Sequence, residues 1–410
     1  MSPWAVAMAA LALAVFMLAL PLAYLGVLTL ASAVRAAPSG VRTLRFRTVV
    51  PAHNEAGHIG ETIASLLGQA YPQELAEVWV VADNCTDATA KEAEAAGARV
   101  LVRNDPSRRG KGYALDHAFT HLLADPAWDA VVVVDADTVV SAHLLAAYAA
   151  RLGAGAQAIQ ADYGVRNPDA SWRTRLMAVA LGMFHRLRAL GRSRLRLSVG
   201  LRGNGMCFAR QLLVRHPHRA HGLVEDVEYG IEIGKGGVAV AYVDEARVLG
   251  EMVSGAKASR SQRQRWEGGR RQLLRAQLGP LVAAAWRQRS ALLADLACDL
   301  LVPPLSTLGL ALVATAAALA AAWAAAILGG QPVPGLTAVS VLWCVDAALL
   351  LAYVGRGAIL SGLGWSALSA LLYAPFYLAW KLALKLVPDR QRGDWVRTAR
   401  EGEDTGAQKK

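Results

Sequence analysis

Acidic side chains at the ends of two apolar runs are the residues of this chain best suited to chemistry. Asp135 and Asp137 follow four valines at 131–134, and Asp83 follows the run 78–82. Four successive valines predict a buried strand of an α/β sheet. Ionised groups are costly in such a core, so these carboxylates should lie past the strand end, where open α/β sheets bind ligands. Two carboxylates there can bind one hard divalent cation, which would also contact substrate phosphates; a solvated turn is the alternative.

Two further segments carry charged groups suited to a phosphorylated substrate. Gly110 and Gly112 permit close backbone approach on either side of Lys111, a point charge for phosphate. This spacing is not that of a P-loop. Glu225 and Asp226 supply a candidate general base, although acidic residues also suit the positive N-terminus of a helix.

Alternating apolar and amphipathic segments predict the scaffold that positions these groups. We expect a domain over 42–280 with α/β architecture and a mostly parallel sheet. The expected strands are 44–50, 78–82, 98–101 and 130–134, and the expected helices are 59–69, 88–96, 113–123 and 143–151.

Charge-free stretches predict a membrane protein. Residues 1–34 are long enough for a transmembrane helix, with cleavage as a signal peptide the alternative. Arginines at 35, 42, 45 and 47 place the following domain on the cytoplasmic side. We expect an interfacial helix region at 281–300, a transmembrane hairpin at 301–355, a third membrane or re-entrant segment at 358–386 and a basic polar tail at 387–410.

The charge balance restricts the classes of partner that the protein could bind. Lysine and arginine number 43 against 32 acidic residues, a net charge of +11. A membrane anchor and the absence of a nucleic-acid-binding motif argue against nucleic acid and favour anionic lipid head groups and phosphorylated substrates. The four cysteines have neither metal-type nor disulfide-type spacing, as expected in a reducing compartment.

Taken in order, the motifs resemble those of the membrane-bound family 2 glycosyltransferases. That group includes cellulose, chitin, hyaluronan and poly-N-acetylglucosamine synthases and non-processive enzymes that make glycolipids. The resemblance covers about 42–270 and rests on Pro51-Ala52-His53-Asn54-Glu55, Asp83, Gly110-Lys111-Gly112, Asp135-Ala136-Asp137, Glu225-Asp226 and Gln262-x-x-Arg265-Trp266.

The resemblance implies a GT-A nucleotide-sugar domain and a role for each motif. The donor nucleotide would contact Pro51, Asn54, Glu55, Asp83, Lys111 and Asp135. Asp135 and Asp137 would hold the sugar diphosphate through Mg²⁺ or Mn²⁺, and Asp226 would be the catalytic base. The acceptor and diphosphate site would comprise Gly203, Asn204, Glu225, Gln262, Arg265 and Trp266. The other arginines near Trp266, including Arg270, are expected to face lipid.

These roles predict an inverting glycosyltransferase that moves a sugar from a UDP-sugar to a lipid-linked or saccharide acceptor at the cytoplasmic face of the cell membrane. A processive polysaccharide synthase is the alternative, although few membrane segments could line a polymer channel without an accessory membrane subunit. A catalytically silent scaffold that binds nucleotide sugars is a third possibility. Ala161, Asp162 and Tyr163 are candidates for acceptor choice, without an assigned role.

Overall fold

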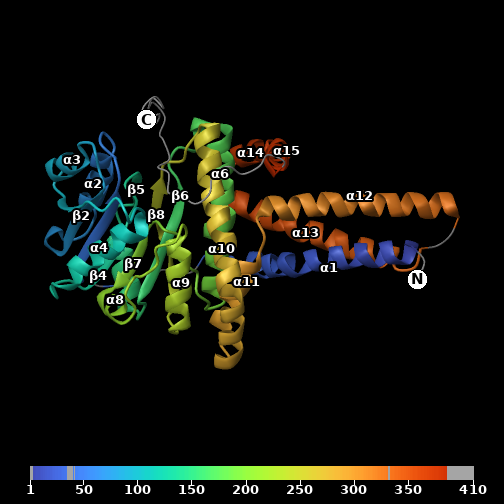
Figure 1. The fold of residues 1–410 in the computed structure, drawn as a ribbon, viewed down its shortest axis with the longest axis horizontal. Coiled ribbons are helices and arrows are strands. Elements are labelled where there is room, and N and C mark those ends of the chain that lie inside the picture. Colours follow the sequence, from blue (N-terminus) through green and yellow to red (C-terminus); the bar gives the residue numbers. More distant parts are fainter. Residues whose placement is uncertain (1–2, 35–39, 41, 331–332, 386–410) are drawn as a thin grey trace.

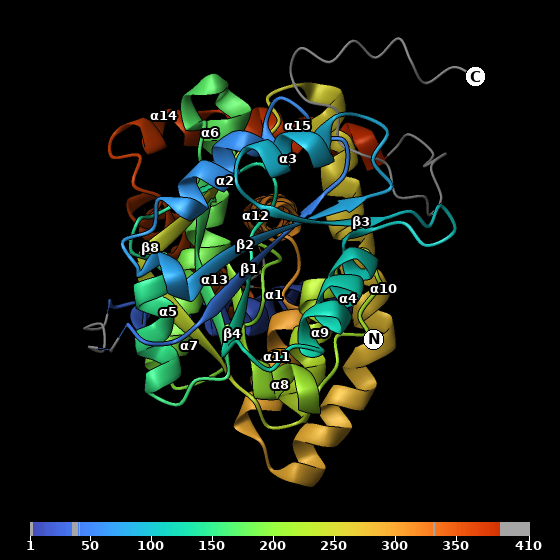
Figure 2. The ribbon, with the colours of Figure 1, turned by 90° about the vertical axis from the view of Figure 1, so that its left-hand side faces the viewer.

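The chain folds into three layers. The computed structural model describes residues 3–34, 40, 42–330 and 333–385, and for 256–261, 263–265 and 380–385 it describes the backbone alone. A sheet domain forms one end, a bundle of long apolar helices forms the other, and crossing helices lie between them (Figure 1). Figure 2 looks through the sheet domain onto the bundle, with α12 seen end-on behind the strands.

The first layer is an eight-stranded sheet with the order β3-β2-β1-β4-β7-β6-β8-β5. β1 is parallel to β2 and β4, β2 to β3, and β6 to β8, while β7 and β5 run antiparallel to their neighbours. This confirms the predicted α/β class and mostly parallel sheet. The strands are β1 Phe46–Ala52, β2 Ala76–Asp83, β3 Arg99–Arg103, β4 Ala130–Val133, β5 Thr138–Val140, β6 Ala158–Val165, β7 Met206–Ala209 and β8 Val240–Gly250.

Helices cover both faces of the sheet. Val132 of β4 packs in the core under α2 (Ile59–Leu67), α3 (Thr89–Ala95) and α5 (Leu144–Gly153). Val131 and Val133 pack in the other core, under α4 (Lys111–Leu123), α8 (Arg210–Arg215) and α9 (Glu225–Lys235). Because side chains alternate across a strand, only a strand covered on both faces needs successive valines.

The crossing layer contains α6 (Trp172–Leu181), the π-helical turn η3 (Gly182–Leu187), α7 (Arg188–Arg194), α10 (Ala256–Gln288) and α11 (Ala291–Leu301). Short 3₁₀ turns lie at η1 (Gln73–Leu75) and η2 (Pro168–Ala170). Helix α10 continues without a break through residue 280, where the sequence analysis ended the catalytic domain. The division of the chain into domains stays a prediction.

The bundle consists of α1 (Pro3–Leu30), α12 (Leu305–Gly329) and α13 (Leu336–Leu360). Each is long and apolar enough to cross a membrane. Helix α13 continues past residue 355, and Arg356 donates to the backbone oxygen of Ser32 over 2.8 Å, so that α1 and α13 have their C-terminal ends together. The last apolar stretch forms two helices, α14 (Ser366–Leu372) and α15 (Ala374–Lys385), each too short to span a bilayer alone.

A buried ion cluster joins the crossing layer to the bundle. Arg192 of α7 is fully buried and forms ion pairs with Asp295 at 3.1 Å and Asp299 at 2.9 Å, both on α11. It also donates to the hydroxyl of Tyr24 on α1 over 2.7 Å. Arg188 adds an ion pair with Asp299 at 3.2 Å. Buried charges are tolerated when they are paired in this way.

Close helix contacts accompany the ion cluster. A Cβ at Gly191 would lie 2.5 Å from the backbone oxygen of Leu28, so α7 packs directly on the backbone of α1. A Cβ at Gly182 would lie 2.6 Å from the backbone oxygen of Gly357, so η3 packs equally closely on α13. Small residues permit such approach between helices in membranes, and here they fix η3 against the end of the bundle.

Breaking the ion cluster should loosen this junction. Arg192→Gln removes a positive charge that neutralises the buried carboxylates of Asp295 and Asp299. Removing one partner of a buried ion pair costs about 3–5 kcal/mol. We expect a clear fall in the thermal unfolding temperature of the detergent-purified protein. Arg45→Gln, which removes an exposed pair with Asp129, is the control and should cost about 1 kcal/mol or less. Equal unfolding temperatures for the two variants would contradict this role.

Candidate active site

The predicted charged groups meet at one edge of the sheet. Lys111, at the start of α4, donates its Nζ hydrogens to the carboxylate of Asp135 and to the backbone oxygen of Gly203. A Cβ at Gly203 would lie 3.4 Å from Oδ2 of Asp226 and 3.7 Å from Nζ of Lys111. Three segments far apart in the sequence therefore bring Lys111, Asp135 and Asp226 around one glycine.

A buried asparagine holds the turn at 203–205 beneath Asp135. The Oδ1 atom of Asn204 accepts a hydrogen bond from the backbone N–H of Asp135 at 3.1 Å, and its Nδ2 donates to Oγ1 of Thr138 at 2.7 Å. Gly203 and Gly205 have φ values of 80° and 70°, which glycine adopts without steric cost. The predicted pair Gly203 and Asn204 thus lies directly against the first predicted metal ligand.

The loops after β1 and β2 form the adjoining part of the edge. Asp83 is buried, and its carboxylate accepts from Nη1 of Arg103 over 2.6 Å. The Nδ1 atom of His53 lies 2.6 Å from the backbone oxygen of Asp83. Oδ1 of Asn54 accepts from the backbone N–H of Thr86 at 2.8 Å, with Asn54 in the left-handed region at φ 56°. Hydrogen bonds between the two loops therefore fix both strand ends.

The remaining residues predicted to contact the nucleotide lie beside these loops. The backbone N–H of Glu55 donates to Oγ1 of Thr89 over 2.8 Å, at the start of α3. Pro51 lies in β1 opposite Val81 of β2. Arg103 was not predicted as a site residue. The available signal was its place at the end of the strand that follows the one ending in Asp83.

Glu225 and Asp226 share one end of the site with Lys111. Burial and the charge of Asp226 raise the pKa of Glu225 to about 7. Burial also raises the pKa of Asp226, against the opposing effect of Lys111. Burial alone would lower the pKa of Lys111, but Asp135 and Glu225 outweigh it and raise the pKa. Both carboxyl groups therefore hold a proton more tightly than a free side chain would, as suits a general base.

The residues present fit a divalent cation whose remaining ligands come from substrate and water. Asp135 and Asp137 are half-buried at the end of β4, and within the described residues no cluster of three or more His, Cys, Asp or Glu side chains could hold a metal ion. Mg²⁺ commonly binds through one or two carboxylates together with waters and substrate phosphates. Two carboxylates suit that arrangement and do not suit a metal site built from protein alone.

Helix α10 carries the motif Gln262-x-x-Arg265-Trp266 and packs against the start of α9. A Cβ at Gly269 would lie 3.0 Å from the side chain of Val224, directly before Glu225. Gln262 and Trp266 are half-buried and one helical turn apart. The side chain of Arg265 lies outside the described residues, so the roles of this motif stay predictions.

Two arginines beside the site were not assigned to it from the sequence. The guanidiniums of Arg202 and Arg270 lie over the ring of Phe184, 4.7 Å and 5.7 Å from its centre. The expectation that Arg270 faces lipid is wrong, because its guanidinium donates to the backbone oxygen of Asp299. Its position one turn after Trp266 was the available signal. Burial lowers the pKa of Arg202 to about 10.

Comparison with known proteins agrees with this geometry. Residues 45–269, more than half of the chain, match the family described as "Glycosyltransferase like family 2", and the chain belongs to that family. It is therefore a glycosyltransferase with a GT-A domain. No curated protein matches the chain.

Solved structures of other glycosyltransferases are similar to this chain, and the first of the two below shares its fold. The mannosyltransferase PcManGT from Pyrobaculum calidifontis, in complex with GDP-Man and Mn²⁺, is 22% identical over 87% of this chain and 97% of its own, with a TM-score of 0.55. Glucosyl-3-phosphoglycerate synthase from Mycobacterium tuberculosis, in complex with Mn²⁺, UDP and phosphoglyceric acid, is 26% identical over 55% of this chain and 77% of its own, with a TM-score of 0.38.

The raised pKa of Glu225 makes stability depend on pH. The folded state holds the proton more tightly than the unfolded chain, whose Glu pKa is about 4.5, so stability falls as pH rises from there to about 7 and stays lower above it. Glu225→Gln removes this titration. We expect its unfolding temperature, relative to wild type, to rise with pH across that window. Glu94→Gln, at an exposed position of α3, should show no such trend, and a flat difference for Glu225→Gln would contradict the prediction.

Proposed function

We propose that the protein is an inverting glycosyltransferase that moves a sugar from a UDP-sugar to a lipid-linked acceptor at the cytoplasmic face of the membrane. The observation that carries the proposal is the meeting of Lys111, Asp135 and Asp226 around Gly203. UDP as the nucleotide rests on the sequence resemblance, whereas the solved mannosyltransferase of similar fold binds GDP-Man.

The donor occupies the edge of the sheet. The nucleoside lies at the loops after β1 and β2, where Asp83 and Asn54 are held by Arg103 and Thr86. The diphosphate lies beside Lys111, whose charge stabilises the leaving group. Asp135 and Asp137 hold Mg²⁺ or Mn²⁺, which supplies Lewis-acid stabilisation of the diphosphate when bound. The binding of Mn²⁺ by the mannosyltransferase of similar fold supports a divalent cation.

Asp226 acts as the catalytic base. The acceptor oxygen attacks the anomeric carbon of the donor sugar from the face opposite the diphosphate, and its proton passes to the carboxylate of Asp226. The bond between the anomeric carbon and the diphosphate oxygen breaks, and the diphosphate leaves with the electron pair. A single displacement inverts the anomeric configuration. The raised pKa of Asp226 increases its affinity for the proton.

The acceptor side comprises Gln262, Arg265 and Trp266 on α10, together with Glu225 and the turn at Gly203. An indole face suits sugar stacking and a guanidinium suits phosphate. Three apolar helices of spanning length within the described residues favour transfer of one sugar over extrusion of a polymer. A processive synthase, which an accessory subunit would have to complete, is the second candidate, and a ladder of products would identify it.

The proposed orientation places the catalytic domain in the cytoplasm and the N-terminus outside. It is supported by the arginines that follow residue 34, according to the positive-inside rule. A cytoplasmic catalytic domain has access to the nucleotide sugars made there.

The central test is Asp226→Asn, which keeps the shape of the side chain but removes the proton acceptor. Since general base catalysis contributes about 10²–10⁴-fold, we expect turnover to fall by that factor while UDP affinity changes by no more than a few-fold. Turnover is measured as UDP release and product formation with a panel of nucleotide sugars in native membranes. Glu228→Gln, two residues along α9 and therefore on a different face of the helix, is the matched control. Near wild-type turnover in Asp226→Asn would place the base elsewhere, with Glu225 the next candidate.

Removal of the divalent cation gives a second test. EDTA should abolish transfer, and added Mn²⁺ or Mg²⁺ should restore it, because the cation neutralises the leaving diphosphate. Asp137→Ala should weaken UDP-sugar binding as well as turnover, unlike Asp226→Asn. Full activity in EDTA would contradict a metal-dependent mechanism.

A further inference from the structure

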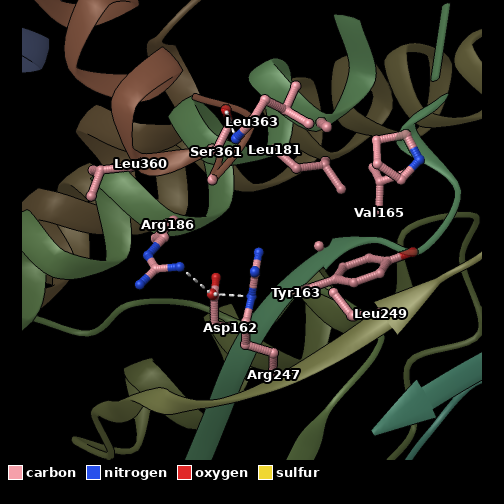
Figure 3. Close-up of a pocket in the computed structure, with 15 residues that line it drawn as sticks. Asp162, Tyr163, Val165, Leu181, Arg186, Arg247, Leu249, Leu360, Ser361 and Leu363 are labelled. Carbon is pink, nitrogen blue, oxygen red and sulfur yellow. Dashed lines mark hydrogen bonds and ion pairs between the residues drawn. The ribbon is translucent and has the colours of Figure 1, made fainter. Parts of the chain in front are cut away.

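A cavity of about 150 Å³ lies between the sheet domain and the end of the bundle (Figure 3). Its walls come from β6, β8, the α6–η3 segment and the residues at the end of α13. A single buried water needs only about 10–15 Å³ on the same measure. The cavity therefore has room for a small chemical group and is much too small for a polymer.

One wall of the cavity carries more positive than negative charge. Asp162 is 1% exposed and forms ion pairs with Arg186 and Arg247, both at 3.0 Å (Figure 3). The hydroxyl of Tyr242 donates to its other oxygen at 3.0 Å. Within the described residues these are the ion pairs of both arginines, so two guanidiniums share one carboxylate. Nε of Arg186 is buried and has no hydrogen-bond partner in the described part of the chain.

Two irregularities of the backbone create this arrangement. The register between β6 and β8 shifts between Ala161 and Asp162, and this places Asp162 opposite Arg247. The π-helical turn η3 carries Arg186 toward the same carboxylate. β-Bulges and π-helical turns are both frequent next to functional sites.

The cavity also has an apolar part. Leu181 of α6 and Leu360 and Leu363 at the end of α13 line it, together with Leu249 of β8. Leu360 is the last residue of a helix long enough to cross a membrane. The cavity thus combines two guanidiniums with leucine side chains, two of which lie at the end of a helix of spanning length.

Tyr163 connects the cavity to the active site. It lines the cavity and stacks on His185, with ring centres 5.1 Å apart. After burial, the nearby carboxylates of Asp135 and Asp137 are the main causes that raise the pKa of its hydroxyl. Its hydroxyl also hydrogen-bonds the side chain of Asn204, which contacts Asp135, so Tyr163 links the cavity to the proposed donor site.

We propose that this cavity binds the phosphate-bearing head group of a membrane lipid, and that this lipid is the acceptor. The proposal rests on the proposed function. Guanidinium groups bind phosphate through paired hydrogen bonds, and Arg186 and Arg247 together carry one positive charge more than Asp162 neutralises, which favours an anion. The leucine wall receives the adjoining apolar part of the lipid, and a hydroxyl of the head group extends past Tyr163 to Asp226. The acceptor class is an anionic phospholipid with a free head-group hydroxyl.

The test measures binding without relying on catalysis. Full-length protein in phosphatidylcholine nanodiscs is irradiated with phosphatidylglycerol that carries a photoreactive acyl chain, and the labelled peptides are mapped. We expect label on α6 and the segment after α13, and a roughly ten-fold lower yield in Arg247→Gln and Arg186→Gln. Arg247→Lys should retain part of the yield, since it keeps the charge but loses the paired hydrogen bonds.

The controls separate a cavity effect from general charge or folding effects. Arg175→Gln removes one positive charge from α6 at a partly exposed pair with Asp169 and should leave the yield unchanged. Gly164→Ala keeps every charge, but its Cβ would lie 2.9 Å from Nη2 of Arg247, so it should displace that guanidinium and lower the yield. Unfolding temperatures report whether each variant folds. Equal yields in all variants, or equal labelling by photoreactive phosphatidylcholine, would overturn the proposal.

Soluble competitors identify the source of the phosphate. Glycerol 1-phosphate and inorganic phosphate should compete only weakly, because they lack the apolar part; competition as strong as that of unlabelled phosphatidylglycerol would overturn a lipid ligand. UDP release from a nucleotide sugar separates failure of the proposed glycosyltransferase activity from failure of the proposed lipid site. If Arg247→Gln hydrolyses donor normally and still glycosylates phosphatidylglycerol like wild type, the cavity is not the acceptor site. If wild type releases no UDP from any donor, the proposed function fails while labelling still tests the cavity.

Discussion

The buried pairing of Arg188 and Arg192 with Asp295 and Asp299 is the constraint on which the arrangement of the layers depends. Each charge would be costly alone in an apolar junction, so α7 and α11 can be buried only when they meet. The hydroxyl of Tyr24 of α1 donates to Asp295 and accepts from Arg192. The same contact fixes η3 and α10 between the sheet and the bundle, and thereby positions the residues of the proposed acceptor side.

The active site depends on a second balance of charges. Three acidic segments converge at one sheet edge, and Lys111 is the cation that contacts Asp135 and lowers the pKa of both Glu225 and Asp226. Burial acts in the opposite direction and keeps those pKa values raised. A raised pKa increases the affinity of a carboxylate for the proton of an acceptor hydroxyl, so the combination of burial and one lysine suits the proposed base.

The backbone is regular around the proposed donor site and irregular around the proposed acceptor wall. The strands that carry Asp83 and Asp135 pair in regular parallel register. The wall with Asp162 and Arg186 depends on a shifted register and a π-helical turn. Regular strands give the proposed donor site a fixed geometry. The proposed acceptor wall, which contains Asp162 and Arg186, must also pack against the end of α13.

The sequence alone determined the sheet class, the apolar helices of spanning length and the acidic groups at one edge of the sheet, because these follow from local signals. Four valines require a strand covered on both faces, and Asp135 and Asp137 had to follow it. Only the tertiary structure showed that Arg270 faces inward, that Arg192 is paired across three helices, and that Asp162 shares its carboxylate between two arginines. Arginine has the same pattern in a sequence whether it faces lipid, solvent or a buried carboxylate, since its long side chain takes its environment from distant segments.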